Sequence, residues 1–392
     1  MSSLKLFQRT IVITATLAAL LISALPANTN AQQETPPAPA APRSINLPKP
    51  VERTLKNGLR VIVIERTTDK GGVPLISAQL FVKNGGEVDP DSLAGLTNMT
   101  AALLTKGTQT RTAPQIAEAI EALGGSLDSG ARWDASTVSL GVMSSKAEPA
   151  MQIMADVVRN PAFKDEEIER QRQQTLDGLR VALKQPGSLA GFVASRVVFG
   201  GTPYGHPLSG TPESISRIKR DDIVKLHQTY YRPDNAVLII GGDIKAGDAF
   251  KLAEKLFGDW QKPATALPAS VAATQTFNPT PRVLVIDKPD AGQAAVVLVR
   301  SGLKRTDPDY YRAIVANSVL NGYSGRLNQE IRIKRGLSYG AGSSLQVRRD
   351  VGPFTASAQT KNESGAEVAS LLIGELTRLA SEPVPDAELT PR

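Results

Sequence analysis

Residues 281–302 read PRVLVIDKPDAGQAAVVLVRSG, and this stretch decides the organisation of the chain because it repeats an earlier one. RVLVI at 282–286 corresponds to RVIVI at 60–64, and AAVVLVRSG at 294–302 corresponds to SAQLFVKNG at 77–85. Such runs of β-branched and apolar residues, bounded by glycine and proline, predict adjacent strands in both places. The offset of 222 residues for the first pair, and of 217 for the second, is too long for a solenoid repeat, whose period is roughly 20 to 50 residues. The sequence therefore predicts a duplicated domain.

Composition suggests where the two domains begin and end. At 392 residues with 41% hydrophobic content, the chain is long enough to form two separate cores. Residues 261–278 fall in the stretch WQKPATALPASVAATQTFNPTP, which has the composition of a linker. We therefore predict a first domain at 51–260 and a second domain at 279–392.

The order of the predicted elements indicates an α+β fold class. Helix-like stretches at 113–125 and 148–161 flank a strand-like stretch at 134–143, and long charged helices follow from Asp165. Neighbouring strands mixed with helices in this way predict a sheet with helices packed on it.

The N-terminus predicts export. Two basic residues precede the apolar run IVITATLAALLISAL at 11–25, and Thr29 and Ala31 suit the small-residue positions of a signal-peptide cleavage site. We expect cleavage near Ala31, at the end of a signal peptide at 1–31, and a periplasmic mature chain. An uncleaved membrane anchor is the alternative, although the run is short for a bilayer span of roughly 20 residues. Residues 32–50 are rich in proline and alanine and predict an extended tether.

Charge and cysteine content exclude several classes of function. The chain has no cysteine, which rules out disulfides, thiolate metal sites and a cysteine nucleophile. Its formal charge of +7 falls to +5 without residues 1–31, which carry two basic and no acidic residues. The basic residues are scattered without interleaved aromatic residues, so a solvated surface is predicted and no nucleic-acid site.

Seven stretches, in this order and spacing, carry a resemblance to a known family. They are LKNGLRVIVIE, GLTNMTAALLTKGT, IAEAIEALGGSLDSGARWDASTVSL, FKDEEIERQRQQTLDGLR, PYGHPLSGTPESI, YYRPDNAVLIIGGDI and GRLNQEIRIKRGLSYGAGSSL. The chain resembles the inverted-zincin metallopeptidases of family M16, which include mitochondrial processing peptidase, the respiratory core proteins and bacterial relatives. The resemblance covers nearly the whole mature chain. It implies two homologous M16-type domains, each a mainly antiparallel sheet packed with helices, that form half of a clamshell.

The resemblance also implies that the family's zinc site is lost. Its motif, His-x-x-Glu-His on a helix, supplies two histidine ligands and a glutamate that activates water. Alignment of the flanks of GLTNMTAALLTKGT places Asn98 and Ala102 at the histidines and Ala101 at the glutamate, while the third ligand falls on Gly178. A carboxamide and two methyl groups cannot hold Zn²⁺ or act as a general base. We therefore expect no metal and no cofactor in this chain.

The remaining candidate ligands do not predict a second metal site. The only two histidines are His206, in a predicted loop, and His227, beside an aromatic pair on a predicted helix; structural or exposed roles are expected for both. One predicted helix begins with a cluster of acidic residues, which is typical of a solvated first turn that favours the helix dipole: Asp165, Glu166, Glu167 and Glu169.

IRIKRGLSY contains Arg332 and Tyr339. Catalytic members of the family use such a pair from the C-terminal half, facing the zinc across a chamber and binding substrate near the scissile carbonyl. A phenolic hydroxyl can donate a hydrogen bond to a developing oxyanion, and a guanidinium can fix a carbonyl. Alternatively, Arg332 forms a surface ion pair and Tyr339 begins a strand as a half-buried aromatic residue. Glycines nearby would allow close approach of an extended peptide, or simply make flexible turns: Gly322, Gly325, Gly336, Gly340 and Gly342.

The resemblance implies a division of labour between two chains. Small bacterial members resemble heterodimers in which one chain carries His-x-x-Glu-His with Zn²⁺ and the other carries the Arg/Tyr pair. This sequence fits the second type, a non-catalytic subunit that binds peptide or unfolded protein and supplies Arg332 and Tyr339 in trans. The alternative is a non-proteolytic peptide-binding or scaffold protein. An independent enzyme is disfavoured because no serine, histidine and acid constellation is evident. The final stretch, SEPVPDAELTPR, stops where family members run on through further helices and a strand. Either the sequence is clipped there or the chain is naturally short, and only in the second case would the second domain lack a packing helix.

Overall fold

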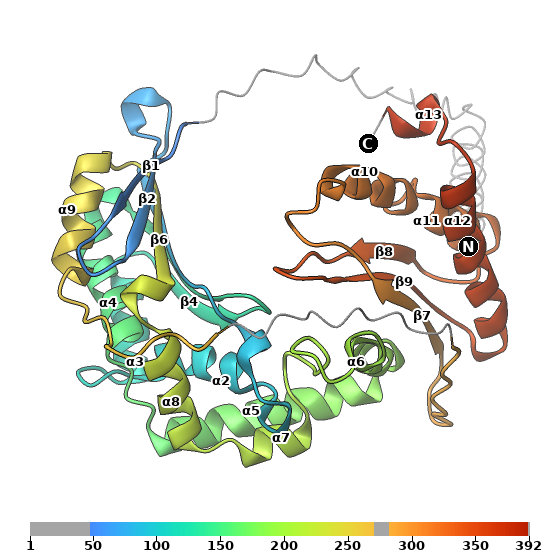
Figure 1. Cartoon of the computed structure of the whole chain (residues 1–392), viewed down its shortest axis with the longest axis horizontal. Helices are drawn as coiled ribbons and strands as arrows, with labels where there is room; N and C mark the ends of the chain where they lie inside the picture. Colours follow the sequence, from blue (N-terminus) through green and yellow to red (C-terminus); the bar gives the residue numbers. More distant parts are fainter. Residues whose placement is uncertain (1–47, 270–281, 391–392) are drawn as a thin grey trace, which may run out of the picture. The chain divides into compact units, whose positions relative to one another are not determined.

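The computed structural model describes residues 48–269 and 282–390 and confirms the α+β class (Figure 1). The predicted signal peptide at 1–31, most of the predicted tether and the second half of the predicted linker lie outside the described residues. Within the described ranges, no helix is long and apolar enough to cross a membrane.

Six strands form the first sheet, in the order β1-β2-β6-β3-β5-β4. Every neighbouring pair is antiparallel except β2 and β6, which run parallel. Residues at alternate positions along β3 and β5 are buried, as expected of strands that pack one face against a core. The strands predicted at 60–64, 77–85 and 134–143 are confirmed as β2, β3 and β5. The bounds are β1 Val51–Thr54, β2 Arg60–Glu65, β3 Leu75–Val82, β4 Ser126–Ala131, β5 Ser136–Met143 and β6 Ala236–Gly242.

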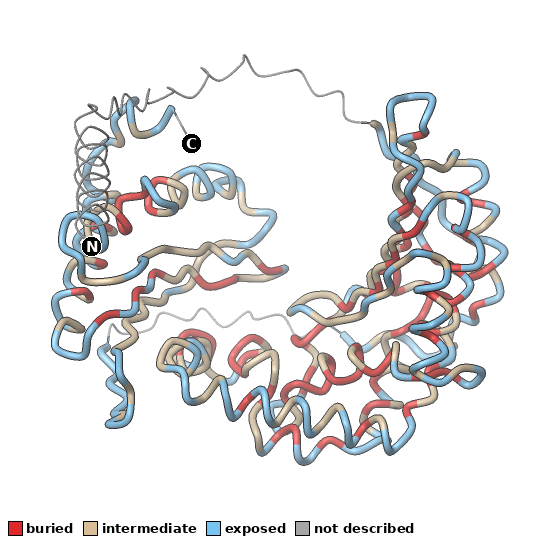
Figure 2. The backbone as a smooth tube through the Cα atoms, turned by 180° about the vertical axis from the view of Figure 1, so that it is seen from behind, coloured by how far each residue is buried: buried red, intermediate tan, exposed pale blue. Residues whose placement is uncertain are grey.

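Helices pack on this sheet and on one another. Helix α4, for example, buries Ala150, Met151, Met154 and Val158, which lie on one side of a helix. These residues join the apolar residues of the strands in one large core, and Figure 2 shows buried positions running along both strands and helices. The bounds are α2 Leu96–Leu103, α3 Ala113–Ala122, α4 Ala147–Arg159, α5 Asp165–Lys184, α6 Pro186–Phe199, α7 Pro212–Arg217, α8 Arg220–Tyr230 and α9 Ala246–Phe257.

A second, smaller sheet has the antiparallel order β7-β9-β8. Its core includes Leu320, Ile331, Ala356 and Leu372, which come from both strands and helices. The hairpin β8–β9 followed by α12 has the same order as β4–β5 followed by α4, as a duplicated domain requires. The bounds are β7 Ala294–Ser301, α10 Tyr310–Leu320, α11 Arg326–Asn328, a π-helix at Gln329–Lys334, β8 Ala341–Leu345, β9 Pro353–Thr360, α12 Gly365–Ser381 and α13 Asp386–Leu389.

The strand predicted at 282–286 as the counterpart of β2 is wrong. Residues 282–288 have no regular structure, and the side chains of Val283 and Val285 are 91% and 81% exposed. Strand β2 is held by β1 on one side and β6 on the other, whereas the second sheet has no counterpart of either strand among the described residues. A β-branched run becomes a strand only when its backbone N–H and C=O groups find partners.

Candidate functional site

Helix α2 contains three of the four positions that the sequence alignment assigned to the lost zinc site, namely the two histidine positions and the position of the glutamate that activates water. It follows Gly95, which has a φ of +91°, and a Cβ at this glycine would lie 2.8 Å from the Cδ1 atom of Ile215. The carboxylate of Asp89 accepts the N–H groups of Gly95 and Thr97 at 2.9 Å each, which satisfies donors at the start of the helix. Leu96, Met99 and Leu103 are buried. The helix is therefore fixed by its cap and its packing.

The four degenerate positions lie on two helices that pack together, α2 and α5. Asn98 and Ala102 are four residues apart on one partly exposed face of α2. Ala101 is buried, and its carbonyl accepts a hydrogen bond from the Ser129 hydroxyl on β4 at 2.7 Å. Gly178 on α5 is exposed, and nothing lies within 4 Å of a Cβ built there. Across residues 48–269 and 282–390, no group of three or more histidine or acidic side chains could hold a metal ion.

Both histidines make structural contacts. The ring of His206 lies 5.3 Å from the Trp133 ring, and its Nδ1 is near a backbone carbonyl. The Nε2 of His227 lies 2.9 Å from the carbonyl oxygen of Val158, and its ring stacks on Tyr231 with centroids 4.7 Å apart. Burial lowers the pKa of both histidines, and that of His227 falls to about 4. Both imidazoles are therefore neutral at pH 7 and held in place by aromatic neighbours.

Three of the four acidic residues at the start of α5 are exposed, as expected of a solvated helical turn, whereas the side chain of Glu167 is largely buried. Glu167 pairs with Arg170 at 3.0 Å and Glu169 with Arg172 at 2.9 Å, each three residues further along the helix. Asp165, Glu166 and Glu167 occupy the first turn, where carboxylates favour the helix dipole.

Arg332 lies on the π-helix at Gln329–Lys334, an unusual element that often marks functional sites. The preceding Ile331 is fully buried in the second core, and Gly336, with a φ of +63°, ends the helix. The Arg332 side chain is exposed, and its guanidinium carbon lies 5.7 Å from the centroid of the Tyr323 ring. No carboxylate pairs with it in the part of the chain that the structure describes. The alternative prediction, that Arg332 forms a surface ion pair, is therefore not observed among the described residues.

Tyr339 lies in a turn just before β8. The Ser338 hydroxyl donates a hydrogen bond to the Gly340 carbonyl at 2.7 Å and accepts one from the Gly340 N–H at 3.1 Å. Tyr339 is 89% exposed, and its hydroxyl has no hydrogen-bond partner among the described residues. The alternative of a half-buried aromatic residue is therefore wrong. Tyr339 presents a free phenolic donor to solvent.

The glycines around this pair serve turns and close packing within the chain. Gly322 and Gly336 have φ values of +82° and +63°, which favour glycine. A Cβ at Gly325 would lie 2.1 Å from the Asn321 carbonyl oxygen. For these three positions, the interpretation as turns is supported.

Two buried carboxyl groups were missed by the sequence analysis. The Glu87 carboxylate accepts hydrogen bonds from the Gly85 N–H at 2.6 Å and the Asn84 side chain at 3.0 Å. Burial raises its pKa, and it raises the pKa of Asp89 to about 7. The stretch GGEVDP carries no periodic signal, and buried acids are rare, so a single sequence gives no reason to place them inside.

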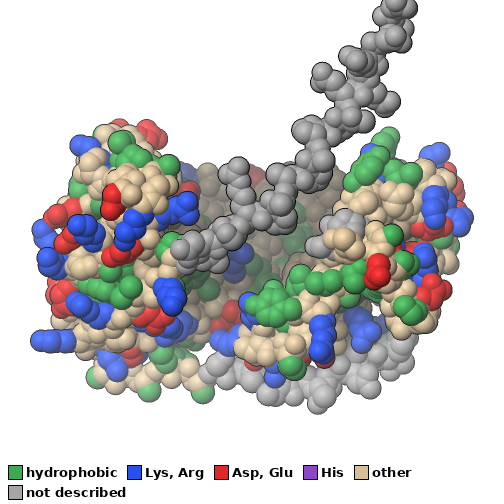
Figure 3. Space-filling model, turned by 90° about the horizontal axis from the view of Figure 1, so that it is seen from above, with side chains coloured by type: hydrophobic (Ala, Val, Ile, Leu, Met, Phe, Trp, Pro, Cys, Tyr) green, Lys and Arg blue, Asp and Glu red, His purple; other side chains and the backbone are tan. Residues whose placement is uncertain are grey.

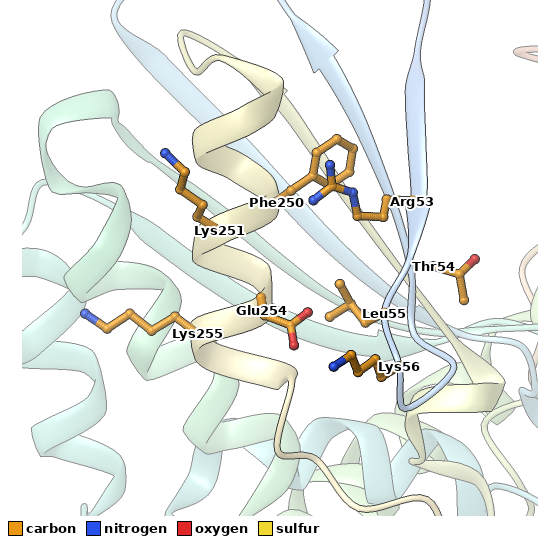
Figure 4. Close-up of a pocket in the computed structure, with 8 residues that line it drawn as sticks. All are labelled: Arg53, Thr54, Leu55, Lys56, Phe250, Lys251, Glu254 and Lys255. Atoms are coloured by element: carbon orange, nitrogen blue, oxygen red, sulfur yellow. The ribbon is translucent and has the colours of Figure 1, made fainter.

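One face of the molecule and one surface pocket can be compared with the predicted site residues. Figure 3 shows basic and acidic side chains interspersed over one face, as expected of a solvated surface. A shallow pocket of about 610 Å³ lies between β1 and α9 (Figure 4). There the guanidinium of Arg53 stacks on the Phe250 ring, 4.5 Å from its centroid. None of the predicted site residues lines this pocket, whose walls are Arg53, Thr54, Leu55, Lys56, Phe250, Lys251, Glu254 and Lys255.

Two family models cover most of the described chain. One, described as Insulinase (Peptidase family M16), matches residues 66–211, and the other, described as Peptidase M16 inactive domain, matches residues 217–390. An uncharacterized zinc protease of Rickettsia bellii is 30% identical over 84% of this chain and 77% of its own length. The chain belongs to peptidase family M16. An uncharacterized zinc protease of Mycobacterium leprae is 29% identical over 86% of this chain and 74% of its own length.

Solved structures confirm the M16 fold. A peptidase M16 inactive domain from Pseudomonas fluorescens superposes with a TM-score of 0.79 at 27% identity, covering 87% of this chain and 82% of that one. A protease from Helicobacter pylori has a TM-score of 0.81 at 21% identity and covers 88% and 83%. The M16 resemblance predicted from the sequence is confirmed. The matches to the M16 inactive-domain model and to the inactive-domain structure are consistent with a member of the non-catalytic type.

Proposed function

We propose that this M16 chain is the non-catalytic, substrate-binding subunit of an exported heterodimeric zinc peptidase. Its partner carries the intact His-x-x-Glu-His motif and the Zn²⁺, and this chain supplies Arg332 and Tyr339 to the partner's active site. One observation carries the proposal. The zinc positions hold Asn98, Ala101, Ala102 and Gly178, while Arg332 and Tyr339 remain exposed and unpaired in the described residues.

The chemistry of the two side chains suits this role. A phenolic hydroxyl can donate to the oxygen of a tetrahedral intermediate, and a guanidinium can fix a peptide carbonyl. Tyr339 is 89% exposed, so its hydroxyl is free to donate to a bound peptide. Both residues sit on elements anchored in the second core, so the fold presents them at defined positions.

Substrate binding is supported by an edge strand beside the degenerate helix. Strand β4 is the last strand of the first sheet, and Ser129 on it hydrogen-bonds to Ala101 on α2. An edge strand offers unpaired backbone groups to which an extended peptide can add as a further strand. Peptide or unfolded protein is therefore the substrate class that fits.

Reconstitution tests the proposed function. The mature chain and an M16 subunit with an intact His-x-x-Glu-His motif, taken from the same organism, are purified separately and mixed. We expect a complex in size-exclusion chromatography, and cleavage of fluorescently quenched casein by the mixture only. A mixture that forms a stable complex without proteolysis would instead indicate a scaffold. Proteolysis by this chain alone would contradict the proposal.

The degenerate site predicts that the purified chain contains no stoichiometric zinc, because neither a carboxamide nor a methyl group replaces imidazole and carboxylate ligands. Elemental analysis by mass spectrometry after dialysis checks this, with the partner subunit as the positive control. One tightly bound Zn²⁺ per chain, lost when Asn98 is changed to alanine, would show that the site is functional after all.

The exported location remains part of the proposal. We expect mature protein to begin near Gln32 and to be released from the periplasm of a Gram-negative host. N-terminal sequencing of the purified native protein measures this directly. Recovery of Met1 on membrane-bound material would favour the uncleaved anchor.

A further inference from the structure

Two equivalent hairpins of the duplicated fold meet at their tips. Trp133 lies in the turn between β4 and β5, and Arg348 lies in the turn between β8 and β9. The guanidinium carbon of Arg348 lies 4.2 Å from the centroid of the Trp133 ring, 4.6 Å from that of Tyr204 and 5.0 Å from that of Phe199. Three rings therefore surround one cation, and we call Trp133, Tyr204 and Phe199 the aromatic cage.

The arginine in this cage lacks the partners that a buried cation normally has. Arg348 is 4% exposed, and its Nε and Nη1 atoms have no hydrogen-bond partner among the described residues. Burial lowers its pKa to about 10. Burying an unpaired charge is costly, and attraction to ring faces is strongest where water is excluded. The cage, together with the nearby Asp134 carboxylate, therefore compensates for this charge.

The next residue adds two polar contacts to the same place. The backbone N–H of Arg349 donates to Asp134 Oδ2 at 2.9 Å, while the Tyr204 hydroxyl donates to Asp134 Oδ1 at 2.5 Å. The Arg349 guanidinium pairs with the buried carboxylate of Glu87 at 3.3 Å. The tip of the β8–β9 hairpin is therefore bonded to Asp134 and Glu87 as well as docked in the aromatic cage.

The turn that carries Arg348 is itself held firmly. The Gln346 N–H donates to the Pro353 carbonyl at 3.0 Å, and the Gly302 N–H donates to the Gly352 carbonyl at 2.7 Å. A Cβ at Gly352 would lie 1.6 Å from the Gln346 carbonyl oxygen, so only glycine fits. Because this turn is rigid, fixing it in place also fixes β8, which begins two residues after Tyr339.

We propose that Arg348 is a positioning residue. By docking in the aromatic cage, it fixes the β8–β9 hairpin and so fixes the strand that leads away from Tyr339. The anchoring of the hairpin by Arg348 does not depend on a partner chain. The role of this anchoring in positioning Tyr339 for catalysis rests on the proposed function.

Hydrogen exchange of the isolated mature chain, read by mass spectrometry, tests the anchor. Arg348→Met keeps most of the apolar stem and removes the cation, and Arg348→Lys keeps a positive charge without the planar group that lies over rings. In Arg348→Met, we expect the amides of residues 341–360 to exchange about tenfold faster than in the unmodified chain, because a desolvated cation–ring contact is lost. In Arg348→Lys, we expect the same amides to exchange at a rate between those of Arg348→Met and the unmodified chain. Arg300→Met, at an exposed position of β7, should leave exchange unchanged.

Two further measurements keep the proposal falsifiable. If Arg348→Met does not fold, Arg348→Lys and Trp133→Leu are compared instead, and both should loosen the same hairpin without affecting α2. A folded Arg348→Met chain with unchanged hairpin exchange would overturn the anchor. In the reconstituted pair, Arg348→Met should lower turnover as well. Faster exchange with unchanged turnover would show that Arg348 anchors the hairpin but does not position Tyr339. A mixture that is inactive even with the unmodified chain would instead show that the proposed function itself is wrong.

Discussion

Changing Tyr339 to phenylalanine or Arg332 to alanine is expected to leave the heterodimer assembled and to reduce its turnover about 100- to 1,000-fold. Loss of one preorganised oxyanion donor removes roughly 3 to 4 kcal/mol of transition-state stabilisation. Tyr339 is 89% exposed and Arg332 has no carboxylate partner in the described residues, so neither change removes a contact on which folding depends.

Steady-state cleavage of a peptide by the reconstituted pair separates the possible roles of the two residues. A contact that strengthens in the transition state lowers kcat, whereas one that merely holds the peptide raises KM. Tyr311→Phe is a matched control, since Tyr311 is also a largely exposed tyrosine of the second half at 69%. Arg300→Ala is the matched control for Arg332→Ala, since Arg300 is also exposed. Full activity in both test variants, with an intact dimer by sizing, would remove the catalytic-support role and leave the scaffold alternative.

Helix α2 illustrates which features of the candidate site can be predicted from the sequence and which cannot. The flanks Gly95-Leu96 and Lys106–Thr108 led to the assignment of Asn98, Ala101 and Ala102 to the zinc-site positions, and the structure shows that all three lie on a helix packed against the sheet. The reason that this helix is retained was not visible in the sequence. It lies in the Asp89 carboxylate, which caps the helix from six to eight residues away, and such side-chain caps leave no periodic pattern.

Tertiary context explains what the sequence analysis missed or predicted wrongly. RVLVI at 282–286 has the same pattern as β2, yet pattern alone does not supply the neighbours that β1 and β6 supply to β2. Arg348 was not singled out because its cage is made by residues that lie 144 or more positions away in the sequence, at Trp133, Phe199 and Tyr204. Local propensity and spacing carry no information about contacts of that range.

Acidification from pH 6.5 to pH 4 is expected to lower the free energy of unfolding by roughly 3 kcal/mol through His227 alone. Burial lowers the pKa of His227 from 6.5 to about 4 in the folded chain, because its ring stacks on Tyr231 and lies edge-on to Phe163. The unfolded chain binds the proton first as the pH falls. The contribution is therefore complete well above pH 6.5, declines as the pH falls through 6.5 and 4, and is fully lost only well below pH 4.

Urea unfolding at pH 7.5, 5.5 and 4.5 measures this contribution when His227→Gln is compared with the unmodified chain. Glutamine keeps an N–H donor for the Val158 carbonyl, which His227 contacts at 2.9 Å, but it has no proton to gain in this range. At pH 7.5 the variant should be the less stable protein because it loses the aromatic stacking. Its deficit should shrink steadily on acidification, since only the unmodified chain loses stability through this residue, while all other titrating groups contribute equally to both proteins. An identical decline in both chains would mean that His227 is as easily protonated in the folded state as in the unfolded one, and that its ring is open to water despite its aromatic neighbours.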